Sequence, residues 1–526
     1  MPRRLRTAIY SVASVVFISK ILGFVRGMVI AHKFGTSAEY DFYLIAVMLP
    51  ALASGVLGYA CYYQFVPFLT RKAEQSGPDD PALFWSSTWS AVNLTLLVSG
   101  AITAAIVLIA PYVLTFWDAG WSPEQFDLIV FYCRLTAASV VLSVSEAFMR
   151  ALLNVKKIYA YPAAGLSLFN LCSIAAIMLL HQHISVGAVA VGMVGGMIVQ
   201  NLYLAVRLIP SQALRYFKAS IVDKESPLFL SVASTLILIE LINRSYFMID
   251  RYFAPRLGEG IVSALNYGQV LVQLPESIVG FAIGAVLFPI FARSDDTSDM
   301  SRFIAAYRKG ITVALLFAVP LAVFFFTNAE SLVHIIYHRG AFDEQSVIMT
   351  ARILRTLVPS IVALFVVSTS IRACYAKGWT RPVLVFAGVF LVTKLAATAL
   401  LPQWFGYVGI SAASSLSHVG FGLGLMGYIV VQWSPHDRNR FLFTLLRLVL
   451  AGFLVYLAAS VFRRITWPLV EESSHVVMYL ALAASALVVF GTYAAVVAML
   501  GFKKYFRDAL PWRRSTRQTE QDLPCD

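Results

Sequence analysis

Long runs of apolar residues, separated by short polar segments that contain Pro, Gly or charge, repeat along almost the whole chain. Leu228–Ile239 and Met478–Ala498 each lie within a run of about 20 predominantly apolar residues, enough to cross the hydrocarbon core of a bilayer as a helix. With these punctuating residues as boundaries, the chain divides into fourteen predicted helices: 7–32, 42–70, 84–110, 126–152, 159–181, 186–208, 227–249, 262–292, 306–327, 350–374, 382–402, 408–431, 441–462 and 475–501. We therefore expect an all-α polytopic membrane protein.

Composition agrees with this pattern. Hydrophobic residues make up 59% of the chain and charged residues 13%, whereas soluble proteins carry roughly 25% charged residues. The net charge of +13 fits basic loops beside membrane spans, so we expect no nucleic acid among the partners. The five cysteines show no CxxC or metal-like spacing, and we expect neither a disulfide framework, a metal site nor a cofactor.

The distribution of Lys and Arg among the loops tests the number of spans. With a cytoplasmic N-terminus, most loop Lys and Arg fall on the cytoplasmic side. The basic residues of the opposite side are few: Lys33, Arg251, Arg256, Arg339, Arg463 and Arg464. An imbalance that alternates loop by loop is what the positive-inside rule requires. The sequence thus predicts a multi-pass inner-membrane protein with both termini in the cytoplasm.

An internal repeat links the two halves of the chain. Leu49-Pro50 of the second predicted helix returns as Leu274-Pro275 of the eighth, Pro162 returns as Pro382, and Gly187 returns as Gly409, each about 220 residues later. Six spans per unit give two parallel six-helix repeats, the plan of many transporters, plus two C-terminal helices. The predicted domains are an N-terminal six-helix lobe (1–210), a C-terminal six-helix lobe (211–435), helices thirteen and fourteen (436–502) and a basic cytoplasmic tail (503–526).

Two basic residues lie in the middle of the first predicted helix, where a charge is costly unless it lines a wet cavity or has a partner. Lys20 and Arg26 are six residues apart, which places them roughly 120° apart around a helix. They could therefore border one cavity without stacking on each other.

The seventh predicted helix carries a second charged group. Glu240 and Arg244 are four residues apart with Glu first, the favourable order for a pair within one helix. Such a pair either neutralises itself so that the helix can insert, or lines a cavity and contacts an anionic substrate. Lys394 has no acid near it in sequence, which makes Glu240 its candidate partner across a cavity. Glu146 and Arg150, another pair of this spacing, lie at a predicted helix end, where anchoring is the better interpretation.

No constellation typical of an enzyme is present in the sequence. His334 and His338 are four apart, but no third ligand is near them in sequence, and an interfacial helix face explains them better. There is no Walker A loop for ATP. We expect a transporter and not an enzyme.

Several segments resemble the MurJ/MviN family of lipid II flippases, within the MOP exporter superfamily. They follow family order along the chain: residues 19–26 (SKILGFVR), 33–37 (KFGTS) with Asp41, 65–67 (FVP), 264–267 (ALNY) with 273–275 (QLP), 339–342 (RGAF), 372–376 (RACYA) with 380–382 (TRP), and 407–411 (YVGIS). The resemblance implies alternating access by two six-helix lobes and a central cationic cavity for an undecaprenyl-pyrophosphate sugar headgroup. It also implies a groove for the lipid tail along helices thirteen and fourteen.

The chain departs from the family pattern at several charged positions. Lys20 stands where the family usually has Arg, Gly27 where it commonly has an acid, and Gln269-Val270 where it has Asp-Arg. The segment Ala51–Val66 contains none of the family's charges, and Arg244 could restore one of them. The family's cation-binding acids have no counterpart in helix eleven, where Lys394 could replace a bound cation as the counter-ion of Glu240.

We therefore expect a flippase that moves a polyprenyl-pyrophosphate-linked glycan, with lipid II the leading substrate, from the cytoplasmic to the periplasmic leaflet. The predicted substrate-binding residues are Lys20, Arg26, Asn243 and Arg244, and the predicted gating or coupling residues are Asp41, Glu240 and Lys394. Further expected partners are membrane lipids, a coupling ion or the membrane potential, and cell-wall synthesis proteins. Three alternatives stay open: a translocase for an exopolysaccharide or O-antigen repeat unit, which the charge-free helix two favours, a cation-coupled MATE-type multidrug exporter, and a transport-inactive scaffold.

Overall fold

The computed structural model describes residues 3–76, 81–117, 120–208, 226–280, 300–470 and 475–502. These residues form helices joined by short turns, and no strand occurs among them. The predicted all-α class is confirmed. The basic tail 503–526 and the last part of the eighth predicted helix, 281–292, lie outside the described residues.

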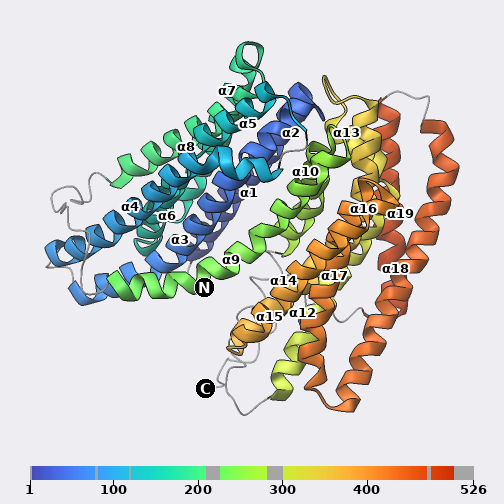
Figure 1. The fold of residues 1–526 in the computed structure, drawn as a ribbon. Coiled ribbons are helices and arrows are strands. Elements are labelled where there is room, and N and C mark those ends of the chain that lie inside the picture. The colour runs from blue at the N-terminus through green and yellow to red at the C-terminus, as the bar shows by residue number, and fades with distance from the viewer. Residues whose placement is uncertain are drawn as a thin grey trace, which may run out of the picture. The chain divides into compact units, whose positions relative to one another are not determined.

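The chain forms two compact units. Figure 1 shows their helices, coloured from blue to red by residue number. Unit 1 comprises residues 1–264 and 337–346. Its helices are α1 (Arg3–Phe34), α2 (Ala38–Ala46), α3 (Met48–Ser76), α4 (Pro81–Leu114), α5 (Pro123–Thr136), α6 (Ser139–Val155), α7 (Ala160–Ile184), α8 (Gly187–Leu208), α9 (Ser226–Phe253) and the start of α10 (Ile261–Pro275), with short 3₁₀ turns at Thr115–Trp117 and Ala254–Leu257.

Unit 2 comprises residues 265–336 and 347–526. It holds the rest of α10, a π-helical turn at Glu276–Gly280, and the helices α12 (Met300–Thr327), α13 (Ala329–Tyr337), α14 (Glu344–Ala376), α15 (Thr380–Leu400), α16 (Pro402–Phe405), α17 (Val408–Val431), α18 (Pro435–Val470) and α19 (His475–Met499). The predicted domains rest on the repeat and stay a prediction. The compact units follow contacts instead, and α9 belongs to unit 1 because it packs on α3.

Each of the fourteen predicted helices coincides with one or two observed helices. Among the described residues, eleven helices are long and apolar enough to cross a membrane, or twelve if the bent pair Ala38–Ala46 and Met48–Gln75 is one span. The seventh and eighth predicted spans correspond to α9 and α10, which are not among these candidates. The protein is a multi-span membrane protein, and the count of fourteen spans stays a prediction.

Two predicted helices are broken in the structure, each for a local reason. The second divides between α2 and α3 with a bend of 41°. Pro50 lies in the first turn of α3, where its ring would clash with the carbonyl of residue 46 if the helix were continuous. The fourth divides between α5 and α6, where the Thr136 hydroxyl donates to the carbonyl of Tyr132 at 2.7 Å, a bond that often bends a helix.

Small residues allow helices to pack closely within each unit. In unit 1, a Cβ atom at Gly196 would lie 2.8 Å from the Phe169 carbonyl oxygen, so α8 approaches the α7 backbone through glycine. Ser173 of α7 also donates to the carbonyl of Gly192 at 2.9 Å. In unit 2, α15 and α17 form the equivalent helix pair. Pro162 is the third residue of α7 and Pro382 the third of α15, which is the correspondence that the repeat predicts.

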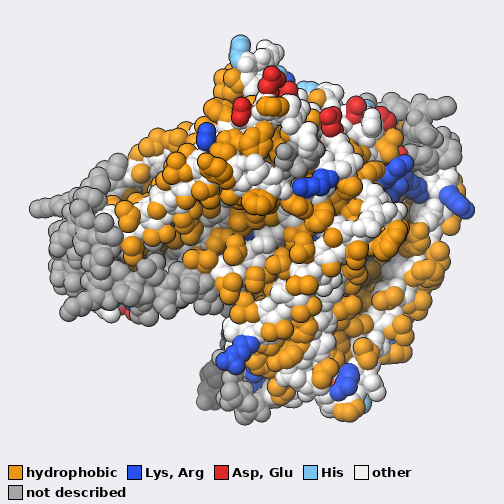
Figure 2. Space-filling view, viewed as in Figure 1, with side chains coloured by type: hydrophobic (Ala, Val, Ile, Leu, Met, Phe, Trp, Pro, Cys, Tyr) orange, Lys and Arg blue, Asp and Glu red, His pale blue; other side chains and the backbone are white. Residues whose placement is uncertain are grey.

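The outer surface of the helices is apolar, as a lipid-facing surface requires. On the face shown in Figure 2, hydrophobic side chains cover most of the described helices, and the few charged side chains lie mainly toward helix ends. Leu446, Val449 and Ile465 of α18 are each more than 60% exposed. In a soluble protein such a surface would aggregate, so the structure supports the assignment to a membrane.

Candidate functional site

Asp41, on the first turn of α2, caps the start of α10. Its carboxylate accepts the backbone N–H groups of Gly260 and Ser263, both at 2.7 Å, and also the Ser263 hydroxyl. The first N–H groups of a helix have no partner within the helix and carry partial positive charge. A carboxylate from another helix satisfies them here, and the side chain is 5% exposed. Asp41 therefore fastens α2 to α10.

A glycine turn brings the backbone before α10 against the loop between α1 and α2. Gly260 has φ +76°, a conformation that favours glycine, and a Cβ atom there would lie 2.3 Å from the Thr36 carbonyl oxygen. A cavity of about 190 Å³ borders Asp41 at this place, lined also by Phe42, Trp121 and Glu259. The two backbone segments are thus in close contact, and the cavity lies beside the Asp41 carboxylate.

Two further glycines join the segment Gly340–Ser346 to the end of α1. Gly340 (φ +61°) lies against the carbonyl of His32, whose oxygen would be 2.3 Å from a Cβ atom at Gly340. Gly35 (φ +55°) lies against the carbonyl of Ala341, whose oxygen would be 2.1 Å from a Cβ atom at Gly35. The Ala341 N–H donates to the His32 carbonyl at 2.9 Å. Only glycine permits such close contacts in this backbone conformation. Three chain segments thus interlock at one end of unit 1.

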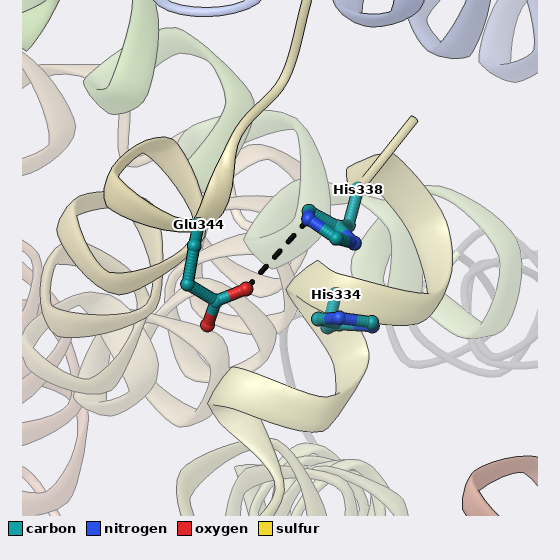
Figure 3. A group of neighbouring side chains, drawn as sticks. All are labelled: His334, His338 and Glu344. Atoms are coloured by element: carbon teal, nitrogen blue, oxygen red, sulfur yellow. Dashed lines mark ion pairs between the residues drawn. The ribbon is translucent and has the colours of Figure 1, made fainter. Parts of the chain in front are cut away.

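Polar side chains fix the start of α14 at the same junction. Asp343 accepts the Ser346 N–H at 2.8 Å and the Ser346 hydroxyl at 2.6 Å, and these bonds lower the pKa of Asp343. The Ser346 hydroxyl also lies 2.7 Å from that of Thr36. Figure 3 shows the neighbouring His338 facing Glu344 across 3.7 Å, with His334 one turn earlier on α13. The interpretation of these histidines as part of a helix surface stays a prediction.

The predicted cationic pair of α1 occupies two different environments. Ser19 is buried and bonds to Ala163 and Ser167 of α7, which fixes the face of α1 that packs on α7. Arg26 lies two turns later on that face, half-buried, with its guanidinium 4.9 Å from the ring centre of Phe169. Lys20 is exposed on the adjacent face. The separation around the helix is as predicted, and a shared cavity stays a prediction.

Arg251 joins Arg26 at a pair of buried tyrosines, and the sequence analysis missed it. Tyr40 and Tyr43 stack with ring centres 6.0 Å apart, and Arg26 and Arg251 both lie within electrostatic range of the two phenols. The sequence predicts Arg251 in a loop on the periplasmic side, but it lies in the last turn of α9 and is half-buried. A signal was present: Arg251 follows Arg244 by seven residues, two turns along the same face of the helix.

Arg244 pairs with Glu240 and rests against a glycine of α3. Its Nε atom lies 2.7 Å from Glu240 Oε1, and the side chains are 40% and 13% exposed. A Cβ atom at Gly55 would lie 2.1 Å from the Arg244 guanidinium carbon, so glycine provides the space that the guanidinium fills. The predicted pair within α9 is confirmed. Asn243, the adjacent predicted residue, is exposed.

Lys394 of α15 is fully buried within unit 2. Its ammonium donates to the Ser414 hydroxyl at 2.5 Å and to the Ile410 carbonyl at 3.5 Å, both on α17. One turn after Ser414, His418 Nδ1 lies 3.0 Å from the Ser360 hydroxyl of α14. Hydroxyl and carbonyl oxygens thus surround this cation. The predicted pairing of Lys394 with Glu240 would join the two units and stays a prediction.

Comparison with known sequences identifies the relatives of this chain. A family model described as lipid II flippase MurJ matches residues 30–500. The lipid II flippase MurJ of Burkholderia cenocepacia is 27% identical over 526 aligned residues, covering 95% of this chain and 98% of that protein. A probable lipid II flippase MurJ of Bdellovibrio bacteriovorus is 24% identical and covers 84% of this chain and 85% of its own length.

Comparison with solved structures gives the same fold. A lipid II flippase MurJ in an inward closed conformation matches with a TM-score of 0.77 at 20% identity, covering 94% of this chain and 99% of that one. An inward-facing multidrug resistance MATE family transporter of the MOP superfamily matches with a TM-score of 0.63 at 15% identity, covering 83% of this chain and 98% of its own. The chain shares its fold with these two proteins.

Proposed function

Because the chain belongs to the lipid II flippase MurJ family, we propose that it moves a polyprenyl-pyrophosphate-linked glycan, with lipid II the leading substrate, from the cytoplasmic to the periplasmic leaflet by alternating access. The observation that carries this proposal is the pair of half-buried guanidiniums of Arg26 and Arg251 at the Tyr40–Tyr43 stack. Buried positive charge within membrane helices marks a path for an anion, and the pyrophosphate is the anionic part of such a substrate.

The basic residues of unit 1 would receive the pyrophosphate. Arg26 and Arg251 offer planar donors that suit phosphate oxygens, and Lys20 on the adjacent face of α1 adds a flexible positive charge. Arg244 contributes a further cation beside the charge-free segment Ala51–Val66 of α3, with Asn243 beside it as an amide donor and acceptor. The Arg244–Glu240 bond holds the guanidinium near Gly55 until substrate competes for it.

Asp41 would act in the gate on the periplasmic side. Its bonds to Gly260 and Ser263, together with the glycine contacts of Thr36 and Gly340, hold three segments together while the site is open to the cytoplasm. Opening toward the periplasm requires these bonds to break as a set. A carboxylate with three donors suits this role because it gives one strong and local contact that can be exchanged for water.

The protein would reside in the bacterial inner membrane with both termini cytoplasmic, surrounded by phospholipid and acting beside cell-wall synthesis proteins. Lys394 and Glu240 would take part in coupling to an ion or to the membrane potential. Lys394 supplies a buried amino group that donates to oxygens of Ser414 and Ile410. The activity is transport without a chemical step on the substrate.

A second candidate substrate is the repeat unit of an exopolysaccharide or O-antigen, on the same fold. The charge-free segment Ala51–Val66 favours it, because fewer cations on α3 would suit a different headgroup. A MATE-type exporter of cationic drugs fits less well, since Arg26, Arg244 and Arg251 would repel such a substrate.

Complementation of a bacterial strain depleted of its lipid II flippase tests the proposal. Expression of this chain should restore growth and cell shape, whereas an Arg26→Gln, Arg251→Gln double variant should not. Growth rescue by both proteins to the same extent would contradict the role of the arginines. No rescue by the wild-type chain, together with rescue of a strain lacking an O-antigen repeat-unit translocase, would support the second candidate.

A further inference from the structure

Unit 2 contains a basic cavity, formed by α12, α14 and α18. It has a volume of about 440 Å³. Phe326 of α12 and Tyr456 of α18 form one wall, with ring centres 5.9 Å apart. Three arginines line the rest: Arg355 of α14, and Arg463 and Arg464 of α18. None of these residues belongs to the site described above.

Positive charge exceeds negative charge in this cavity. Glu330 lies 3.0 Å from Arg355 and 3.5 Å from Arg463, so one carboxylate serves two guanidiniums. Arg463 also donates to the carbonyl of Thr327 at the end of α12, which holds it in place. Arg464 adds a third guanidinium that is exposed. The net charge favours an anion in the cavity, and a phosphate oxygen accepts well from arginine donors.

The cavity lies near the ends of two of its helices, α12 and α18. α12 ends at Thr327, which lines the cavity, and α18 ends at Val470, shortly after Arg464. Arginines near the ends of membrane helices extend toward the interface. A lipid that approaches the cavity from the membrane would therefore place its headgroup at these arginines.

An exposed apolar stripe continues from the cavity along α18. Phe453, Leu457 and Val461 follow at four-residue spacing and are 55%, 44% and 58% exposed. Residues at this spacing lie on one helix face, next to the face of Tyr456 and Ser460 that lines the cavity. The combination of a basic pocket and an adjoining apolar face matches a molecule with an anionic head and acyl chains.

We propose that this cavity binds the phosphate of an anionic phospholipid, with the acyl chains lying along α18. In the proposed orientation of the chain, this lipid belongs to the periplasmic leaflet. Arg355, Arg463 and Arg464 contact the phosphodiester, and the apolar stripe distinguishes a lipid from a soluble anion. Basic pockets between membrane helices bind lipid headgroups by the same physics.

Native mass spectrometry of the delipidated full-length protein, titrated with dioleoylphosphatidylglycerol, tests this proposal. Arg464→Gln removes a charge that is not part of the Glu330 contacts and should weaken the tightest lipid binding about tenfold, the usual cost of one charged hydrogen bond. Ser460→Trp fills the cavity while all three arginines stay, and should abolish that binding. Thermal unfolding of both variants shows that the fold persists.

Arg447→Gln is the matched control, because Arg447 lies on the same helix with its guanidinium 4.3 Å from the Phe443 ring, outside the cavity. Its lipid affinity should stay within about twofold of wild type, a change smaller than one charged bond. An equal loss in Arg447→Gln would overturn the proposal in favour of diffuse surface charge. Equal affinity for phosphatidylcholine would overturn the requirement for net negative charge, and displacement of the lipid by millimolar inorganic phosphate would identify a free-anion site instead.

Discussion

At the scale of single residues, glycine decides where charge can lie in the membrane. Gly55 has no side chain, and the Arg244 guanidinium occupies the space that a Cβ atom at this position would fill. The sequence indicates the pairing of Arg244 with Glu240 by their spacing, but it does not indicate which helix faces the guanidinium. The structure adds that α3 accommodates the cation, so that the charge-free segment Ala51–Val66 still faces a positive group.

Gly55→Ala should displace the Arg244 guanidinium without removing its charge. Because the new methyl group meets the end of a flexible side chain, the fold should persist while the contact between Arg244 and Glu240 changes. We expect transport to fall about tenfold, the effect of one charged hydrogen bond, with little change in melting temperature. Reconstituted flipping assays measure this. Gly58→Ala is the control, since its nearest neighbour is Ser143 at 3.4 Å, and a similar loss there would count against Arg244.

Arg251 and Arg256 offer a comparison within one segment. Arg251 is half-buried beside Tyr40 and Tyr43, whereas Arg256 is exposed and lies over the Tyr252 ring at 4.1 Å. Arg251→Gln should reduce transport at least about tenfold, because a buried charge that meets the substrate is lost. Arg256→Gln should transport at nearly the wild-type rate. Equal rates for the two variants would remove Arg251 from the proposed site.

Lys394→Met tests whether the buried ammonium has a function beyond packing. Replacing a buried charge by an apolar side chain of similar length is often neutral or stabilising, so the melting temperature should hold or rise. If Lys394 acts in coupling, transport should fall about tenfold or more at the same time. Lys377→Met is the control, because that ammonium lies over the Phe303 ring at the end of α14. We would abandon the coupling role if both variants transport alike.

At the scale of elements, the start of α10 depends on a side chain far away in sequence. Asp41 lies more than 200 residues before Ser263, and the two are joined by backbone and side-chain hydrogen bonds. No local signal at residues 258–263 predicts this cap, because the capping group comes from another helix. The motif that contains Asp41 identified the residue, and its partners came from the fold.

Asp41→Asn should loosen the first turn of α10. Asparagine has one acceptor oxygen, and its NH2 group cannot accept the second N–H group. The unsatisfied N–H group destabilises the turn by about 1–3 kcal/mol, which should speed amide exchange at 260–263 by roughly ten- to hundredfold. Ser263→Ala loses only the hydroxyl contact and should show a smaller increase. Hydrogen–deuterium exchange measures both. Asp343→Asn removes a cap from α14 and should leave amide exchange at 260–263 unchanged. If Asp41→Asn does not speed amide exchange at 260–263, the proposed role of Asp41 in the gate is contradicted.

At the scale of the whole molecule, the flippase proposal requires water at the basic residues of unit 1. Single cysteines at positions 20, 26 and 244, in a background without native cysteines, should react with a charged, membrane-impermeant maleimide. Val449→Cys on the lipid-facing surface of α18 should not react, since the reagent does not enter hydrocarbon. Reactivity at the three positions as low as at 449 would contradict a wet, anion-binding path.

The sequence alone predicted the long helices of the described residues, because transfer of apolar segments into the bilayer is a local property that hydropathy measures directly. The short helices α13 and α16 were not among the fourteen predicted ranges. Breaks at Val47 and Ala137 were missed, since a bend within a span leaves its hydropathy unchanged. Charged residues within apolar segments can also be recognised from the sequence, because a charge inside the membrane costs free energy and is usually retained for a function. Lys20, Arg26, Glu240 and Lys394 are such residues.

Only the tertiary structure decided which of these charges meet which partners. In lipid there is no hydrophobic drive between helices, so their contacts depend on shape and on small residues, which a one-dimensional pattern does not encode. The fit of Arg244 to Gly55, the joint approach of Arg26 and Arg251 to two tyrosines, the cap of α10 by Asp41 and the basic cavity around Arg355 all arise from that packing. The chain's hydropathy thus determined a membrane bundle with costly internal charges, and the close approach of distant helices determined the environment of each charge.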